Sequence, residues 1–144
     1  MSFPAPVPGL VLRYAYLWKR EAETGREEAA KDRPCAIILT SHMENNGQRV
    51  FVLPVTHSPP AQADMAVEIP AATKSRLGLD AHRSWIVVTE VNEFVWPGPD
   101  LRPIPGSSNV FTYGILPPGF FRIVRERFLA CARNKHGVAV RRSG

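Results

Sequence analysis

The chain has 144 residues, of which 44% are hydrophobic and 22% are charged, proportions typical of one compact folded domain and not of a disordered segment. It contains no run of about 18 apolar residues, so we expect no membrane-spanning helix. The first six residues, MSFPAP, lack the basic and apolar regions of a signal peptide, and we therefore expect a cytoplasmic protein.

The formal net charge is +5, and the surplus of Lys and Arg lies in residues 73–144. A basic surface is compatible with a polyanion or an acidic protein partner, whereas charge alone favours a solvated helix face followed by a basic tail. Cys35 and Cys131 form no CxxC pair and no zinc spacing. We predict that both are small buried side chains, and a disulfide is the alternative that a cytosolic setting disfavours.

Strands separated by polar segments are predicted in the first half of the chain. Residues 10–18 are aromatic and aliphatic with partial alternation, which predicts a first strand. Residues 19–32 contain nine charged side chains, which predicts a surface loop with room for one helical turn. Residues 35–40 and 49–56 are apolar runs on either side of an Asn-Asn-Gly turn at 45–47, which predicts a β-hairpin.

Shorter elements are predicted in the second half, before a final helix. They are a strand at 66–69, a helix at 70–77, a strand at 84–91 and a strand at 110–116. Residues 96–106 are rich in Pro and Gly and are predicted to be irregular. Apolar side chains recur at helical spacing from Phe120 to Cys131, which predicts a helix over 120–133.

This order of elements predicts a mainly β fold with a C-terminal α-helix, built as a small barrel or sandwich. The sequence contains no internal repeat and no boundary between domains. We therefore expect a single domain over residues 1–144, with a core at about 8–133 and a basic tail at 134–144.

Five short motifs follow one another in a characteristic order. They are Pro8-Gly9 before the first strand, Arg33-Pro34 after the charged loop, Pro54-Val55-Thr56, Val67-Glu68-Ile69, and a strand of aliphatic residues that ends at Glu90. Over roughly residues 8–95 this ordered set resembles the PemK/MazF toxins. The resemblance implies an SH3-like β-barrel with a C-terminal helix that forms a two-fold dimer. It also implies cleavage of single-stranded RNA without metal or other cofactor, and an antitoxin that blocks the groove between the protomers.

Metal-free RNA cleavage requires a group that takes the proton of the 2′-hydroxyl, cationic donors for the phosphorane, and a proton for the leaving oxygen. Arg33 matches the family's catalytic arginine, and Pro34 biases it toward extended geometry at the end of the loop. Thr56 matches the family's threonine and could donate to the phosphate. His57 is a reasonable acid or base because an unperturbed imidazole titrates near about pH 6.5. Glu28 matches the family's loop glutamate.

Each of these residues also has a plain structural interpretation. Arg33, Glu28 and His57 could be exposed loop residues, and Thr56 could be a β-branched residue at a strand end. Arg26 and Lys31 could contact phosphates or simply solvate the loop.

The segment after Glu90 departs from the family, because no basic residue follows that glutamate. In its place stand Asn92, Phe94 and Trp96, which are candidate RNA-binding residues: an aromatic ring there could stack on an RNA base. Alternatively, the segment could plug the barrel or contact a second protomer.

Other enzyme motifs are missing from the sequence. It contains no phosphate loop, no HExxH and no GxSxG motif, and its four histidines have no metal-ligand spacing. Two non-enzymatic alternatives remain. One is an SH3-like binding module that lost nuclease activity and binds proteins through residues 94–96 and the basic C-terminus. The other is a regulatory nucleic-acid-binding protein.

Overall fold

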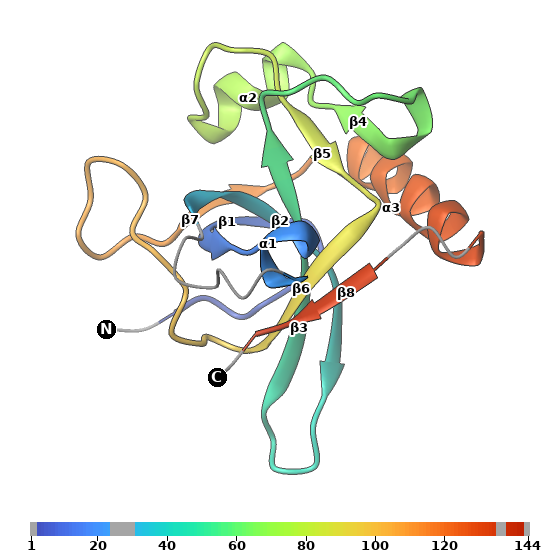
Figure 1. Cartoon of the computed structure of the whole chain (residues 1–144). Helices are drawn as coiled ribbons and strands as arrows, with labels where there is room; N and C mark the ends of the chain where they lie inside the picture. The colour runs from blue at the N-terminus through green and yellow to red at the C-terminus, as the bar shows by residue number, and fades with distance from the viewer. Residues whose placement is uncertain (1–2, 24–30, 135–137, 143–144) are drawn as a thin grey trace.

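The computed structural model describes residues 3–23, 31–134 and 138–142, and its described part is dominated by one curled sheet of eight strands (Figure 1). The strands are β1 Leu10–Tyr16, β2 Lys31–His42, β3 Gln48–Thr56, β4 Ala66–Glu68, β5 Trp85–Val87, β6 Glu90–Val95, β7 Thr112–Ile115 and β8 Val138–Arg141. The helices are α1 Lys19–Glu23, the 3-10 turn η2 Ala63–Met65, α2 Ala71–Leu77 and α3 Pro118–Arg133. None of the described helices is both long and apolar enough to cross a membrane.

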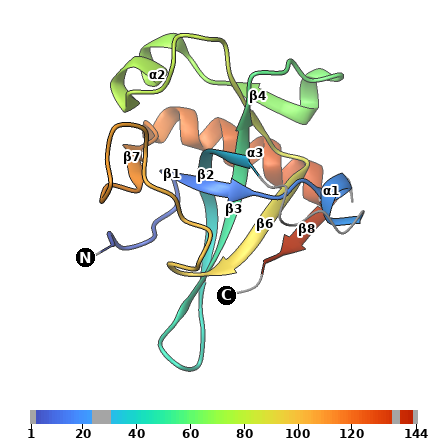
Figure 2. The same cartoon turned by 60° about the vertical axis from the view of Figure 1, so that its left-hand side comes forward.

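The long hairpin β2–β3 is the centre of the sheet, and β1 and β7 extend it on the β2 side. On its other edge β3 pairs with two strands in turn, β6 over residues 49–52 and β5 over residues 55–56. Because the partners diverge, the sheet opens along β3 and curls into a half-barrel (Figure 2). The hairpin turn contains Asn46 with a positive φ of 65°, as the Asn-Asn-Gly signal predicts.

An irregularity interrupts the hairpin. From the turn, His42 to Leu39 pair with Gln48 to Phe51, but the next pair is Ile37 with Val52. Ile38 is therefore an extra residue in β2, a β-bulge that shifts the register of the hairpin by one position.

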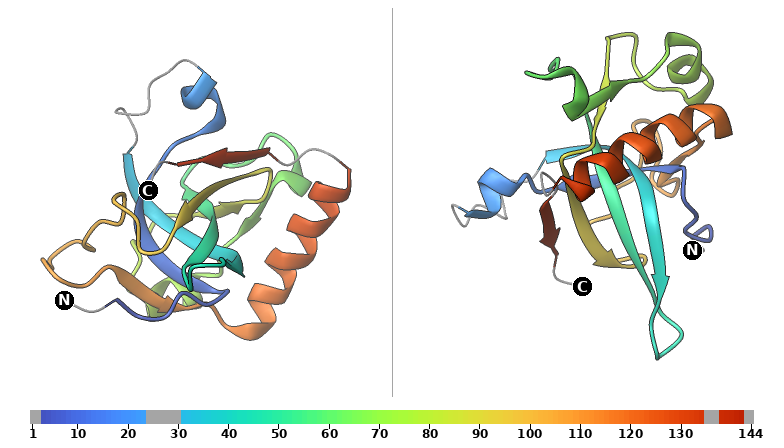
Figure 3. Two further views of the ribbon diagram at one scale, coloured as in Figure 1. Left: turned by 90° about the horizontal axis from the view of Figure 1, so that it is seen from below. Right: turned by 90° about the vertical axis from the view of Figure 1, so that its right-hand side faces the viewer.

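Apolar side chains are buried on both faces of the sheet. On β2, Ala36 and Ile38 belong to one cluster, whereas Cys35 and Ile37 belong to the other, as the alternation of a strand requires. Helix α3 covers the first cluster, into which it inserts Val124 (Figure 3).

The second cluster is covered by aromatic side chains and by the irregular segment after β6. Tyr14 stacks on Phe94 with 4.5 Å between the ring centroids, and Leu101 closes the cluster from the irregular segment. Trp18 and Trp96 pack at its margin.

The predicted mainly β fold with a C-terminal helix is confirmed, as are the hairpin and the irregular segment at 96–106. The final helix begins two residues earlier than predicted, at Pro118, because proline fits the first turn of a helix. Both cysteines are buried free thiols, so the alternative of a disulfide is wrong.

Two predicted boundaries are also wrong. The single strand at 84–91 is divided into β5 and β6, because the chain bends at residues 88–89, where the Val88 N–H donates to the Met65 carbonyl. The basic tail at 134–144 contains β8, which lies parallel to β6. Arg142 beyond β8 is buried, and its guanidinium donates to the Ala15 carbonyl over 2.7 Å and lies 3.2 Å from Asp100.

Candidate functional site

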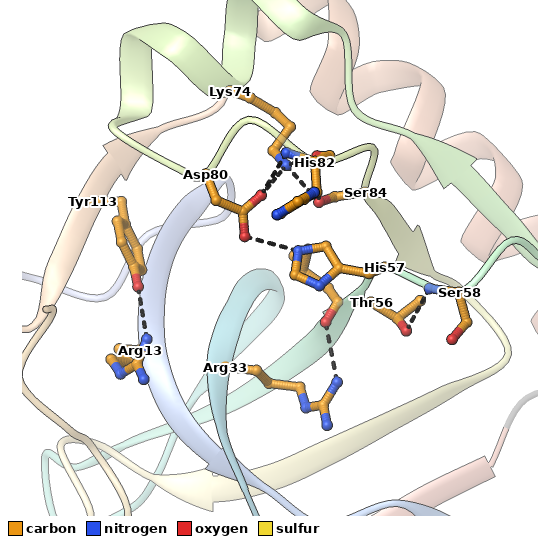
Figure 4. Close-up of polar contacts among 11 residues, drawn as sticks. Arg13, Arg33, Thr56, His57, Ser58, Lys74, Asp80, His82, Ser84 and Tyr113 are labelled. Carbon is orange, nitrogen blue, oxygen red and sulfur yellow. Dashed lines mark hydrogen bonds and ion pairs between the residues drawn. The ribbon is translucent and has the colours of Figure 1, made fainter.

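A groove of about 600 Å³ lies at the end of β3, between the start of β2 and the segment that follows α2. Strands β2 and β3 contribute Arg33 and Thr56, and His57 follows directly after β3. Asp80 faces His57 from the segment after α2, while Tyr113 of β7 lines the opposite side (Figure 4). The groove thus brings together side chains that are far apart in the sequence.

Arg33 lies within β2 and not at a loop end, because residues 31–33 pair with β1. Its guanidinium carbon is 5.0 Å from the centre of the Trp18 ring, and its Nη1 donates to the Val55 carbonyl over 3.3 Å. The Nε–H is buried and has no acceptor among the described residues. The bond to Val55 uses one Nη1 proton, and no other hydrogen bond of the Nη groups is seen among the described residues, so the guanidinium can donate to an anion.

Thr56 and His57 both line the groove, because β3 ends at Thr56 and the alternation of the strand no longer applies to His57. The Thr56 Oγ1 atom accepts the Ser58 N–H over 3.2 Å, which fixes the side chain. Since this bond uses a lone pair of the oxygen, the hydroxyl proton remains available to donate to a ligand.

Lys74 and Asp80 were not among the predicted site residues, and both look like solvated polar residues in the sequence. Helix α2 ends at Leu77 and is capped by Gly78 in the left-handed conformation, with a φ of 72°. This turn returns the chain toward the helix, so that Asp80 Oδ1 lies 2.7 Å from the Lys74 ammonium. The other oxygen, Asp80 Oδ2, lies 2.8 Å from His57 Nε2.

The pKa of Asp80 is lower than usual. Burial alone would raise it, but the hydrogen bonds from Lys74 and His57 together outweigh burial and favour the carboxylate. Asp80 therefore stays ionised over a wider range of acid pH than an ordinary aspartate.

Positive charge predominates elsewhere in the groove. Arg13, Arg33 and the exposed Lys31 line it, and Arg13 donates to the Tyr113 hydroxyl over 3.3 Å. Asp32 lines it too but lies 3.6 Å from Arg102, outside the groove. A strip of three basic side chains is suited to a phosphate backbone.

A second groove of about 550 Å³ adjoins the first at Thr56 and contains Trp18 and Glu90. Glu90 Oε1 accepts the Tyr16 hydroxyl over 3.1 Å and the Lys19 N–H over 2.9 Å. Burial nevertheless raises the pKa of Glu90, because it outweighs both hydrogen bonds. Half-buried carboxyls of this kind are frequent in functional sites.

We predict that Glu90→Gln melts at a temperature a few degrees higher than wild type at pH 8. The folded state holds the Glu90 proton more tightly than the unfolded chain, whose glutamates titrate near about 4.3. Stability is therefore lost as the pH rises from that value through the raised pKa, and glutamine avoids this loss. Thermal unfolding of both proteins at pH 4 and pH 8 measures this difference in melting temperature, which we expect to be smaller at pH 4. The exposed Glu126→Gln on α3 is the control, and an equal gain there at pH 8 argues against burial as the cause.

Several predicted site residues lie elsewhere. Asn92 and Phe94 are buried, with 0% and 2% of their surface exposed, so neither presents a face to a base, and this part of the prediction is wrong. Trp96 is half-buried at the margin of the second cluster, and it does not line the groove that holds Arg33. Arg26 and Glu28 lie outside the described residues.

The same burial weakens the protein-binding surface that the sequence suggested as an alternative. That surface required Phe94 and the basic C-terminus to be exposed, but Phe94 and Arg142 are both buried. As for metal ions, the described ranges hold no group of three His, Cys, Asp or Glu side chains able to bind one.

A comparison with models of protein families identifies the family of this chain. Residues 16–94 match the model of a family described as the PemK-like, MazF-like toxins of type II toxin–antitoxin systems. This range contains β2 and β3 with Arg33, Thr56 and His57, and also the Lys74–Asp80 pair. A comparison with curated proteins found none that matches the chain.

Proposed function

Because the chain belongs to the PemK-like, MazF-like toxins of type II toxin–antitoxin systems, we propose that it is an endoribonuclease that cleaves single-stranded RNA without a metal ion. The observation that carries this proposal is the convergence of Arg33, Thr56 and His57 on one basic groove. Side chains of these three kinds can supply the charge, the hydroxyl donor and the proton acceptor that cleavage requires.

In the proposed reaction, the 2′-oxygen attacks phosphorus while the bond to the 5′-oxygen breaks. His57 takes the 2′-proton, a solvent water gives a proton to the departing 5′-oxygen, and the proton held by His57 then returns to the resulting hydroxide, so that the proton balance is kept. Arg33 stabilises the charge of the phosphorane, because its planar guanidinium matches two phosphate oxygens and does not deprotonate. Thr56 donates its hydroxyl proton to the phosphate. Glu28 remains a second candidate for proton transfer.

The products are a 2′,3′-cyclic phosphate and a 5′-hydroxyl. The family implies an antitoxin partner, and we propose that the antitoxin carries an acidic segment that occupies the basic groove. We also propose a homodimer with a shared groove, and action in the cytoplasm, where such an enzyme meets RNA.

The test is incubation of the purified protein, freed of any bound inhibitor, with a long single-stranded RNA in EDTA. We expect fragments whose 5′ ends are labelled by polynucleotide kinase without prior dephosphorylation. A DNA of the same sequence is the matched control, because it lacks the attacking 2′-hydroxyl, and it should stay intact. A folded, inhibitor-free protein that leaves the RNA uncut contradicts the proposal.

A further inference from the structure

Lys74 is a buried cation in helix α2, whose other charged residue, Arg76, is exposed. Its side chain is only 6% exposed, although lysine is among the residues least often buried. The ammonium donates to Asp80 Oδ1 over 2.7 Å, to Ser84 Oγ over 2.6 Å and to the His82 carbonyl. An ammonium has three protons, and here each of them has an acceptor.

These bonds fix the carboxylate of Asp80, and its two oxygens have different hydrogen-bond partners. Oδ1 accepts the Lys74 ammonium and also the His82 N–H, over 3.1 Å. Oδ2 is left for His57, whose Nε2 lies 2.8 Å away. The carboxylate therefore cannot rotate without breaking bonds to a buried group, even though 49% of its side chain is exposed.

Stability alone does not account for this arrangement. The pair formed by His57 and Asp80 is largely exposed, and exposed ion pairs contribute little to folding. Burying the Lys74 ammonium carries a desolvation penalty, which a hydrophobic side chain of similar size would avoid. A rigid carboxylate aimed at one nitrogen of an imidazole is, in contrast, what controls the tautomer of a histidine.

We propose that Asp80 is a positioning residue for His57 and that Lys74 anchors it. The carboxylate keeps the proton of neutral His57 on Nε2. The other nitrogen, Nδ1, then has a free lone pair and is the atom that accepts the 2′-proton. Nδ1 has no hydrogen-bond partner among the described residues. When His57 becomes an imidazolium, Nε2–H still donates to Asp80, and the carboxylate stabilises the new charge. This inference rests on the proposed function in one respect, namely that His57 is the base that takes the 2′-proton of RNA.

The charged and titratable groups around His57 are few. Asp80 and His82 face it from the segment after α2, with 5.6 Å between the two imidazole centroids, and Lys74 acts through Asp80. Arg33 lines the same groove from β2. Asp80 is thus the only one of these groups that is bonded to the imidazole in the described part of the chain.

The test combines ¹⁵N NMR of the histidine side chains with kinetics on RNA. In wild type at pH 8 we expect His57 to be the Nε2–H tautomer, and in Asp80→Asn we expect a mixture of tautomers. We expect kcat to fall roughly 10- to 100-fold in Asp80→Asn, with KM for RNA unchanged, because a second group that orients a reacting group typically has an effect of this size. Lys74→Met should lower kcat less, and Asp64→Asn, an exposed aspartate outside the groove, should leave it unchanged.

The outcomes separate the inference from the proposed function. Wild type that does not cut RNA overturns the nuclease, but the tautomer still tests the role of Asp80. A wild-type His57 that carries its proton on Nδ1, or a folded Asp80→Asn with full kcat, overturns the inference while the nuclease stands. If Asp80→Asn fails to fold, the tautomer of wild type and the kcat of Lys74→Met decide.

Discussion

Arg33→Ala lowers kcat for RNA cleavage by about 10²- to 10³-fold, the loss expected when a preorganised donor to a developing charge is removed. Arg33 is stacked on Trp18 and bonded to the Val55 carbonyl, so its guanidinium is already in place before RNA binds. Arg33→Lys should recover little of the rate, because an ammonium lacks the planar fork that contacts two phosphate oxygens. Single-turnover rates with a short fluorescent RNA measure both variants.

The matched control for Arg33 is Arg125→Ala, an exposed arginine of α3 that does not line the groove. This control separates loss of a specific donor from loss of general positive charge, and it should keep the wild-type rate. Equal rates for wild type and Arg33→Ala would remove Arg33 from the mechanism and point to a contaminating nuclease.

Asn92→Leu lowers the free energy of unfolding by roughly 2–4 kcal/mol, because two buried backbone groups lose their partners. The Asn92 amide donates to the Leu17 carbonyl over 2.8 Å, and its oxygen accepts the Leu17 N–H over 2.8 Å. The same oxygen accepts a bond from the buried Arg142 over 3.2 Å. Leucine has a similar volume but offers none of these bonds. Chemical denaturation followed by tryptophan fluorescence measures the loss.

Asn109→Leu is the control for Asn92, because Asn109 is an exposed asparagine in the irregular segment before β7. Its free energy of unfolding should stay within about 0.5 kcal/mol of wild type, as is usual for exposed positions. If Asn92→Leu also changed the free energy of unfolding by no more than about 0.5 kcal/mol, the Asn92 amide would not join β6 to the end of β1 as described.

The sequence predicted those elements whose signals are local. The hairpin followed from two apolar runs around Asn-Asn-Gly, and the final helix from apolar residues at helical spacing. The division between β5 and β6 could not be predicted, since SWIVVTEV is a continuous strand pattern and the bend depends on Met65, far away in the chain. Strand β8 was missed because its parallel partner is some 48 residues distant along the chain, as Glu90 pairs with Val138.

The candidate site was predicted only in part, because local motifs mark some of its residues and tertiary structure alone places the others. Arg33 and Thr56 stand in short motifs that can be recognised without tertiary structure. Lys74 and Asp80 could not be recognised, because only the fold shows that the lysine is buried. Asn92 stands between Val91 and Glu93, so no local pattern marks it as buried, and only the fold shows that its amide bonds to Leu17.

The bulge at Ile38 has a consequence for insertions and deletions in this protein. Beyond it, Cys35 pairs with Pro54, and continuing that register places Arg33 across from Thr56 on the same face of the hairpin. If Ile38 instead paired with Val52 and no bulge formed, the register set by the turn would place Pro34 across from Thr56, and Arg33 would lie on the opposite face. Loss of the Ile38 codon would therefore keep Arg33 across from Thr56, because Leu39 and Ile37 already pair with consecutive residues of β3. One residue inserted between Arg33 and Ile37 would instead move Arg33 to the opposite face of the hairpin and separate it from Thr56.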